Sequence, residues 1–269
     1  IQAFITIFKS ILDKLGIGTI LRILRAGAVQ FLVVFPVSSL RLAVGCLRVN
    51  IHFFESRQEE LIVGIFSKKT IWLLAFAFGC QVFVNIGITT WAAKFFNLKF
   101  FAGENLPMAS SIAMLTSCGF AIFGVMVGGR MSDKMAVRSK LARMRTEYIG
   151  LLGGAPFLLA VGFASDLWVA CAAMALYGIF RGVYDSNIYA AMFDVIDPKL
   201  RASSVGILTA FAFIVGCLAP VYLGAVQGDG TNIEAFEWGI SSMGLFFLVG
   251  GLLIAAAAKF TFLKECYEE

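Results

Sequence analysis

The chain has 269 residues, of which 59% are hydrophobic and only 14% charged, with a net charge of +5 and a mean hydropathy of +0.87. A water-soluble domain is ~45–50% apolar and ~25% charged, so the composition excludes a single soluble core, and the 27 phenylalanines exclude a disordered chain. The composition therefore predicts an all-α membrane protein with room for about six to eight spans of ~20 residues.

Residues 1–66 do not divide cleanly into spans. Seven bases interrupt their apolar stretches, and the longest uninterrupted one, Ala26–Leu40, has 15 residues and contains Pro36. Such a stretch is short for a span, and the proline weakens it as a helix. Three interpretations stay open: an interfacial amphipathic segment, a poorly formed helix, or the remnant of a preceding span.

The single histidine of the chain, His52, limits its chemistry. One histidine excludes an HExxH zinc site and a paired-histidine metal site, and it argues against a Ser-His-Asp triad. The sequence also has no GxSxG, P-loop or CxxC motif. We therefore expect no enzyme activity, no cofactor or metal ion, and no nucleic-acid partner.

Six apolar stretches follow from residue 70 onward. They are Thr70–Ala93, Pro107–Gly128, Ile149–Ala164, Leu167–Phe193, Ala202–Val226 and Trp238–Ala258. The third is short for a span unless flanking residues join it. No stretch shows the sustained alternation of a strand, so the sequence predicts six transmembrane helices.

A polar stripe runs along the first predicted span. Gln81, Asn85 and Thr89 are four residues apart, so they share one face of a helix. Hydrogen bonds between helices explain such groups about as well as the lining of a cavity does. Gln81 and Asn85 are the residues of this stripe that we predict to bind substrate.

The loop after the second predicted span is rich in glycine and charge. Residues 128–140 read GGRMSDKMAVRSK. Glycines let helix ends approach closely, an acid is favoured near a helix N-terminus, and bases bind that acid or lipid phosphates. Membrane anchoring explains the individual bases. The ordered set Gly129, Asp133, Lys134 and Arg138 favours a tight linker between helices that move against each other.

The fourth predicted span carries charge inside the membrane. Arg181 is unfavourable there unless it faces the protein interior, water or a partner. Helical spacing places Tyr177, Tyr184 and Asp185 on its face, with Arg181 and Asp185 at i, i+4. One interpretation is a self-neutralising structural pair. The other is a site for an anionic or hydroxyl-rich substrate, with the tyrosines stacking or hydrogen-bonding. Asp185 would relay a proton there, unless its pairing with Arg181 holds it ionised.

Basic residues alternate between the ends of the predicted spans. Twelve lie on one side (Lys68, Lys69, Arg130, Lys134, Arg138, Lys140, Arg143, Arg145, Lys199, Arg201, Lys259 and Lys264), and two lie on the other (Lys94 and Lys99). By the positive-inside rule, the basic side is cytoplasmic. We therefore predict a multi-pass protein of the cell membrane (the inner membrane in a bacterium) with a solvated cytoplasmic tail at residues 265–269.

The charged loop resembles a signature of the major facilitator superfamily, Gly-x-x-x-Asp-(Arg or Lys)-x-Gly-Arg-(Arg or Lys), which follows the second helix of each six-helix half. The ordered set named above fills four positions, whereas Ala136 and Val137 replace a glycine and a base. The segment Asp194–Ser204 also resembles the family's linker between the fourth and fifth helices of a half. The resemblance covers about residues 67–264, as the C-terminal half of a transporter, and leaves residues 1–66 unmatched.

This resemblance implies two three-helix groups that are inverted repeats of each other, at about residues 70–164 and 167–260. It also implies substrate bound near the midplane and an N-terminal six-helix half as partner. In the family, the acid of the signature interacts near the start of the fifth helix of its half and gates the inner face. Asp133 would take this role together with Lys134 and Arg138, and Arg201 is its candidate partner.

These features predict alternating-access transport of a small polar or anionic metabolite, such as a sugar, sugar acid or organic anion, by proton symport. The predicted substrate site comprises Arg181, Tyr177, Tyr184, Asp185, Gln81 and Asn85. The alternative is a non-transporting membrane scaffold or assembly subunit, in which Arg181 and Asp185 form a structural pair.

Overall fold

The fold was determined as a computed structural model, which describes residues 67–227 and 232–266. These residues lie within one compact unit, Leu61–Glu269. Within this part of the chain, six helical segments are long and apolar enough to cross a membrane, as the sequence predicts. The predicted segment 1–66 lies outside the described residues.

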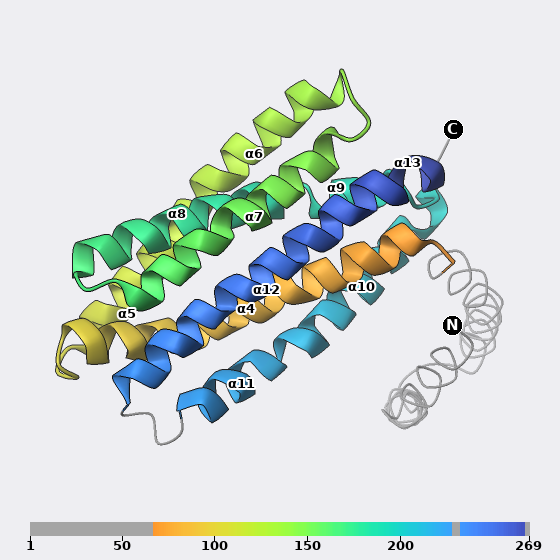
Figure 1. The fold of residues 1–269 in the computed structure, drawn as a ribbon. Helices are drawn as coiled ribbons and strands as arrows, with labels where there is room; N and C mark the ends of the chain where they lie inside the picture. The colour runs from red at the N-terminus through yellow and green to blue at the C-terminus, as the bar shows by residue number, and fades with distance from the viewer. Residues whose placement is uncertain (1–66, 228–231, 267–269) are drawn as a thin grey trace, which may run out of the picture. The chain divides into compact units, whose positions relative to one another are not determined.

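The described elements are all helical (Figure 1). In chain order they are α4 (Lys69–Phe100), α5 (Leu106–Met114), the π-helical turn η1 (Leu115–Gly119), α6 (Phe120–Ala136), α7 (Ala142–Phe163), α8 (Leu167–Asp185), α9 (Ile188–Phe193), the 3₁₀ turn η2 (Pro198–Leu200), α10 (Arg201–Gly216), α11 (Leu218–Gln227), α12 (Ile233–Phe260) and α13 (Phe262–Glu265). The third span, predicted short at Ile149–Ala164, begins seven residues earlier, because its charged flank joins the helix.

Three of the six spans are interrupted. The second contains the turn η1, and the fourth breaks at Ser186 and Asn187, directly after the predicted charge pair. The fifth breaks at Cys217, where Pro220 provides the cause, since proline cannot donate the backbone hydrogen bond to the preceding turn. Interruptions of spanning helices are typical of places where a membrane protein binds ligands or bends.

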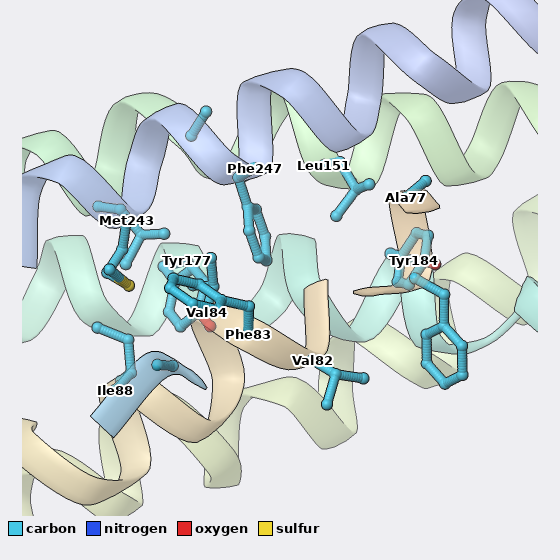
Figure 2. Packing of buried hydrophobic residues seen from close by; sticks show 14 of the residues in the cluster. Ala77, Val82, Phe83, Val84, Ile88, Leu151, Tyr177, Tyr184, Met243 and Phe247 are labelled. Carbon is cyan, nitrogen blue, oxygen red and sulfur yellow. The ribbon is translucent and has the colours of Figure 1, made fainter. Parts of the chain in front are cut away.

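The helices alternate in direction, so α4 and α8, which open the two three-helix groups, run antiparallel (Figure 1). The helix α12 packs along both α7 and α4, while α8 packs against α7 and α6. Their shared core is apolar and aromatic. In Figure 2, Phe247 of α12 points toward Tyr177 of α8, and the two ring centroids are 5.3 Å apart.

Glycines bring α6 and α8 into backbone contact. Gly124 and Gly128 on α6 are four residues apart, as are Gly178 and Gly182 on α8. A Cβ atom at Gly182 would lie 2.1 Å from the carbonyl oxygen of Ala121, and one at Gly124 would lie 2.0 Å from that of Ile179. These small-xxx-small patterns allow the close approach, and sequence analysis did not single them out.

The end of the bundle that holds Lys68, the loop 137–141, the segment 194–200 and α13 is called the basic-loop end below. The predicted tail is not wholly solvated there. The Glu265 carboxylate accepts hydrogen bonds from the backbone N–H groups of Lys69 and Thr70, at 3.1 and 2.9 Å. An acid at a helix N-terminus satisfies otherwise unpaired N–H groups, which explains why the end of the chain returns to α4.

Candidate functional site

The structure joins the two predicted polar stripes at one point. Gln81 of α4 donates a hydrogen bond from Nε2 to Asp185 Oδ1 at 2.9 Å, and Arg181 Nε lies 3.4 Å from Asp185 Oδ2. Gln81 is 3% exposed, whereas the Asp185 side chain is 29% exposed. The carboxylate of Asp185 therefore binds one residue from each opening helix, and its remaining surface stays accessible.

A third element reaches Arg181 from the interrupted second span. Arg181 Nη1 lies 3.9 Å from Cys118 Sγ, which belongs to the π-helical turn η1. A Cβ at Gly178 would lie 2.5 Å from the carbonyl oxygen of Ser117, so α8 and η1 are in direct backbone contact beside this residue. A guanidinium has five donors, and the described residues engage them only through this sulfur and Asp185.

Tyr177 and Tyr184 lie on the same face of α8 as Arg181, with their side chains in the core. Both are fully buried in the apolar core (Figure 2), and neither hydroxyl has a hydrogen-bond partner among the described residues. Their helical spacing with Arg181 is the predicted one, but their hydroxyls lie in the packing between helices. A substrate reaches them only if α8 moves relative to α4 and α12, so their binding role stays a prediction.

The other two residues of the α4 stripe, Asn85 and Thr89, differ in their hydrogen bonding. Asn85 Oδ1 is buried without a hydrogen-bond partner in the described part of the chain, so it offers an unused acceptor one turn from Gln81. Thr89 bonds to the carbonyl oxygen of Asn85 at 2.8 Å, which satisfies it within its own helix. Asn85 thus fits the predicted polar site better than Thr89 does.

The predicted gating set lies at the basic-loop end. Asp133, Lys134 and Arg138 are exposed, and nothing lies within 4 Å of a Cβ placed on Gly129. None of the ion pairs among the described residues includes Asp133. Arg201 instead donates to the Phe193 carbonyl oxygen at 3.0 Å and lies over that ring. The structure therefore does not pair Asp133 with Arg201, and the gating role stays a prediction.

A different ion pair ties the helices together at this end. Arg143 at the start of α7 pairs with Asp194, which follows α9, through Nη1 and Oδ1. Burial raises the pKa of the Asp194 carboxyl, while the positive charges of Arg143 and Arg201 oppose that rise. We call Arg143 and Asp194 the clamp. Sequence analysis counted Arg143 only as a loop charge, since nothing in the sequence places it beside Asp194.

Sequence comparison identifies the family. The Major Facilitator Superfamily model matches residues 25–220, which is most of the chain and includes all the spans from α4 to α10. The chain belongs to the Major Facilitator Superfamily. The match begins within the segment 1–66, so the likeness to the superfamily reaches further toward the N-terminus than the loop signature indicates. Among curated proteins, none matches the sequence.

Solved structures show the same superfamily fold. The chain is similar to a bacterial homologue of the human lysosomal transporter Spinster in an inward-facing, unoccupied conformation, with a TM-score of 0.66 and 18% identity over 78% of this chain and 51% of that one. The occupied form of that inward-facing homologue gives a TM-score of 0.62 and 18% identity over 76% and 52% of the two chains. The chain thus spans about half the length of these transporters.

At the end of the bundle opposite the clamp, a second ion pair links helices of this superfamily member. Lys99, near the end of α4, pairs with Glu237 of α12 at 2.7 Å and donates to the Gly162 carbonyl oxygen of α7 at 2.7 Å. At the basic-loop end, Lys68 donates to the carbonyl oxygens of Val195 and Glu265. Both ends of the bundle are therefore held by charged side chains that bond across helices.

Proposed function

We propose that the chain is the C-terminal half of a secondary transporter that moves a small polar or anionic metabolite by alternating access. The observation that carries this proposal is the cluster of Gln81, Asp185 and Arg181. It joins the opening helices of the two three-helix groups inside the membrane. Charged groups within spans are rare and typically mark substrate or ion pathways.

The donors of Arg181 favour an anionic or hydroxyl-rich substrate, such as a sugar acid, an organic anion or a sugar. Asp185 neutralises the guanidinium in the resting site, and a substrate carboxylate or hydroxyl would use the donors that Asp185 leaves unoccupied. Gln81 and the free acceptor of Asn85 would supply hydrogen bonds to hydroxyl groups. Tyr177 and Tyr184 would join the site only when α8 separates from its neighbours.

Alternating access needs cross-links that form and break at the two ends of the bundle. The clamp and the pair of Lys99 with Glu237 lie at opposite ends, and each joins different helices. We propose that the clamp closes the cytoplasmic side, because the basic loops gather at its end and the positive-inside rule assigns them to the cytoplasm. The C-terminus would then be cytoplasmic as well.

A second six-helix unit would complete the carrier. In the second and fifth spans, 33% and 28% of the most apolar window is buried, against 44–61% in the other four spans. These two spans therefore leave much apolar surface for lipid or for another helical unit. The matched part of this chain corresponds to 51–52% of the solved transporters, which supports a six-helix partner half.

Proton symport is part of the proposal, and the sequence predicts Asp185 as its carrier unless Arg181 holds that carboxylate ionised. Gln81 donates to that carboxylate, and Arg181 lies beside it. Both contacts favour the ionised form. Asp185 therefore acts as a fixed negative charge in this arrangement, and the coupling proton requires another group.

A membrane scaffold with a structural Arg181–Asp185 pair is the competing function. Ligand-induced thermal stabilisation separates the two, using the purified protein and a panel of sugars, sugar acids and organic anions. A transporter site predicts a rise in Tm with at least one anionic or hydroxylated compound, and loss of that rise in Arg181→Ala. Lys140→Ala, an exposed loop change, is the control that should keep it.

Uptake into proteoliposomes then tests the transport itself. Arg181→Ala and Asp185→Asn should each abolish uptake of the stabilising compound by the complete carrier. Unchanged uptake in either variant would exclude this cluster as the substrate site. A chain that no compound stabilises, and whose Arg181→Ala variant only unfolds more easily, would be a scaffold.

A further inference from the structure

The second turn of α7 holds a carboxyl group that the proposed substrate site does not use. Glu147 is 0% exposed, and neither Oε1 nor Oε2 has a hydrogen-bond partner among the described residues. It lies inside the third span, ~8 Å along the helix from Ala142. An ionised carboxylate without a partner is strongly unfavourable in such a place. The surroundings of Glu147 therefore hold it as the neutral acid.

Close packing separates this group from solvent on the α8 side. One turn further along α7, a Cβ at Gly150 would lie 2.8 Å from the Phe180 carbonyl oxygen and 3.0 Å from Tyr184 Cβ. Tyr184 interacts electrostatically with Glu147, and its own hydroxyl is buried without a hydrogen-bond partner in the described part of the chain. No room is left between α7 and α8 for a hydrated carboxylate.

The clamp supplies the charges next to Glu147. Asp194 acts on Glu147 electrostatically, and it is paired with Arg143, which precedes Glu147 by one turn on the same helix. The charged groups of α6 and α12 toward this end all occupy exposed positions: Arg130, Asp133, Lys134 and Lys259. Arg143 is thus a cation one helical turn from the buried acid, and in this structure it is paired with Asp194.

We propose that Glu147 is a proton-binding site and that Arg143 exchanges partners between Asp194 and Glu147. With the clamp closed, Arg143 neutralises Asp194 and Glu147 keeps its proton. When the ends of α7 and α9 separate, Arg143 pairs with Glu147 at i, i+4. The O–H bond of the carboxyl then breaks, the electron pair stays on Glu147, and the proton passes to water at the basic-loop end. Arg143, Glu147 and Asp194 together go from a net charge of zero to minus one.

This exchange couples proton binding to closure of one end of the bundle. Each proton bound by Glu147 releases Arg143 to Asp194 and so favours the closed clamp, and closure in turn favours proton binding. A coupling role in transport rests on the proposed function. The protonation and the partner exchange do not, because they need no substrate, so they are measured separately.

Infrared spectroscopy of the protein in lipid bilayers tests the protonation at neutral pH. A carbonyl stretching band from a neutral carboxylic acid should be present in the wild type and absent in Glu147→Gln. The matched control is Glu237→Gln, which removes a carboxyl group paired with Lys99 and should leave the band unchanged. Carboxyl-labelled glutamate should shift the band in the wild type, which identifies it even if the Glu147 variant fails to fold.

Two clamp variants test the exchange of partners. Asp194→Asn frees Arg143, so the Glu147 band should disappear, with release of about one proton per protein. Asp194→Asn combined with Arg143→Gln should restore the band, because the buried acid again lacks a cation. A wild-type protein without the glutamate band, or a band unchanged in Asp194→Asn, would overturn the proposal. A wild-type protein that shows the Glu147 band but is stabilised by none of the tested compounds would instead count against the proposed substrate site.

Discussion

Asp185 and Glu147 are both carboxyl groups on spanning helices, yet their surroundings differ. Asp185 accepts a hydrogen bond from Gln81, faces Arg181 and keeps 29% of its side chain exposed. Glu147 is fully buried and has no hydrogen-bond partner among the described residues. The contrast indicates that the charge state of an acid in a membrane depends on the partners around it. Depth along a helix alone does not set it.

The two acids would therefore have different roles in the bundle. Under the two proposals, an ionised Asp185 beside Arg181 would make a site of fixed charges for a polar ligand, because the pair keeps the cation in place without filling all of its donors. A neutral Glu147 beside the clamp would make a site whose charge changes when helices separate. Four measurements of the free energy of unfolding in mixed micelles test this difference.

The largest effect is expected from Arg181→Ala. Removing the cation leaves the Asp185 carboxylate inside the membrane without its charge partner, which should cost on the order of 3 kcal/mol of unfolding free energy. Because 29% of the Asp185 side chain is exposed, solvation of its carboxylate should offset part of that loss. Arg181→Lys should recover most of the stability. An Arg181→Ala variant as stable as the wild type would show that Asp185 is not held as an anion.

Glu147→Met should change stability in the opposite direction. An unpaired polar group is replaced by an apolar side chain of similar length, so the free energy of unfolding should rise by about 1–2 kcal/mol. Equilibrium unfolding of the variant against the wild type measures the gain. A clear loss of stability would reveal a polar partner for Glu147 and remove the contrast with Asp185.

The sequence predicts the fold well and the site in part. Hydropathy and loop charges are local properties, so six spans with alternating basic ends follow from them directly, and the structure confirms the spans. The i, i+4 spacing likewise predicts the pair of Arg181 and Asp185. The sequence places Gln81 and Asp185 in one predicted site without predicting a contact, and the structure joins them by a hydrogen bond.

Other features depend on pairings between helices, which one sequence does not show. Arg143 and Asp194 are 51 residues apart, and each is an ordinary loop charge by spacing alone. Glu147 precedes the predicted third span, in a charged segment that the sequence assigns to a loop. Only the extension of α7 back to Ala142 places it within the bundle. Helical periodicity also assigns Tyr177 to the face of Arg181, but it cannot tell which side of that face packs into the core.

Gln81→Leu should produce a smaller loss than Arg181→Ala. It removes one hydrogen bond to Asp185, and such bonds between spanning helices contribute about 1 kcal/mol. The matched control is Asn85→Leu on the same face of α4, where the side-chain oxygen has no hydrogen-bond partner among the described residues, so its stability should stay near that of the wild type. Equal losses in both variants would mean that the bond from Gln81 to Asp185 contributes nothing specific.

The smallest effect is expected from Glu147→Gln, and this variant makes the sharpest comparison. The amide has nearly the shape of a protonated carboxyl and the same charge of zero, so the free energy of unfolding at neutral pH should change by less than about 0.5 kcal/mol. Asp185→Asn applies the same chemical change to the partnered acid and should cost about 2–3 kcal/mol, since Arg181 then lacks its counter-charge. Thermal unfolding of the two variants side by side compares a site that is already neutral with one that is ionised. Equal losses would mean that both carboxyls are held in the same charge state, and the partner exchange at Arg143 would then have no neutral Glu147 to act on.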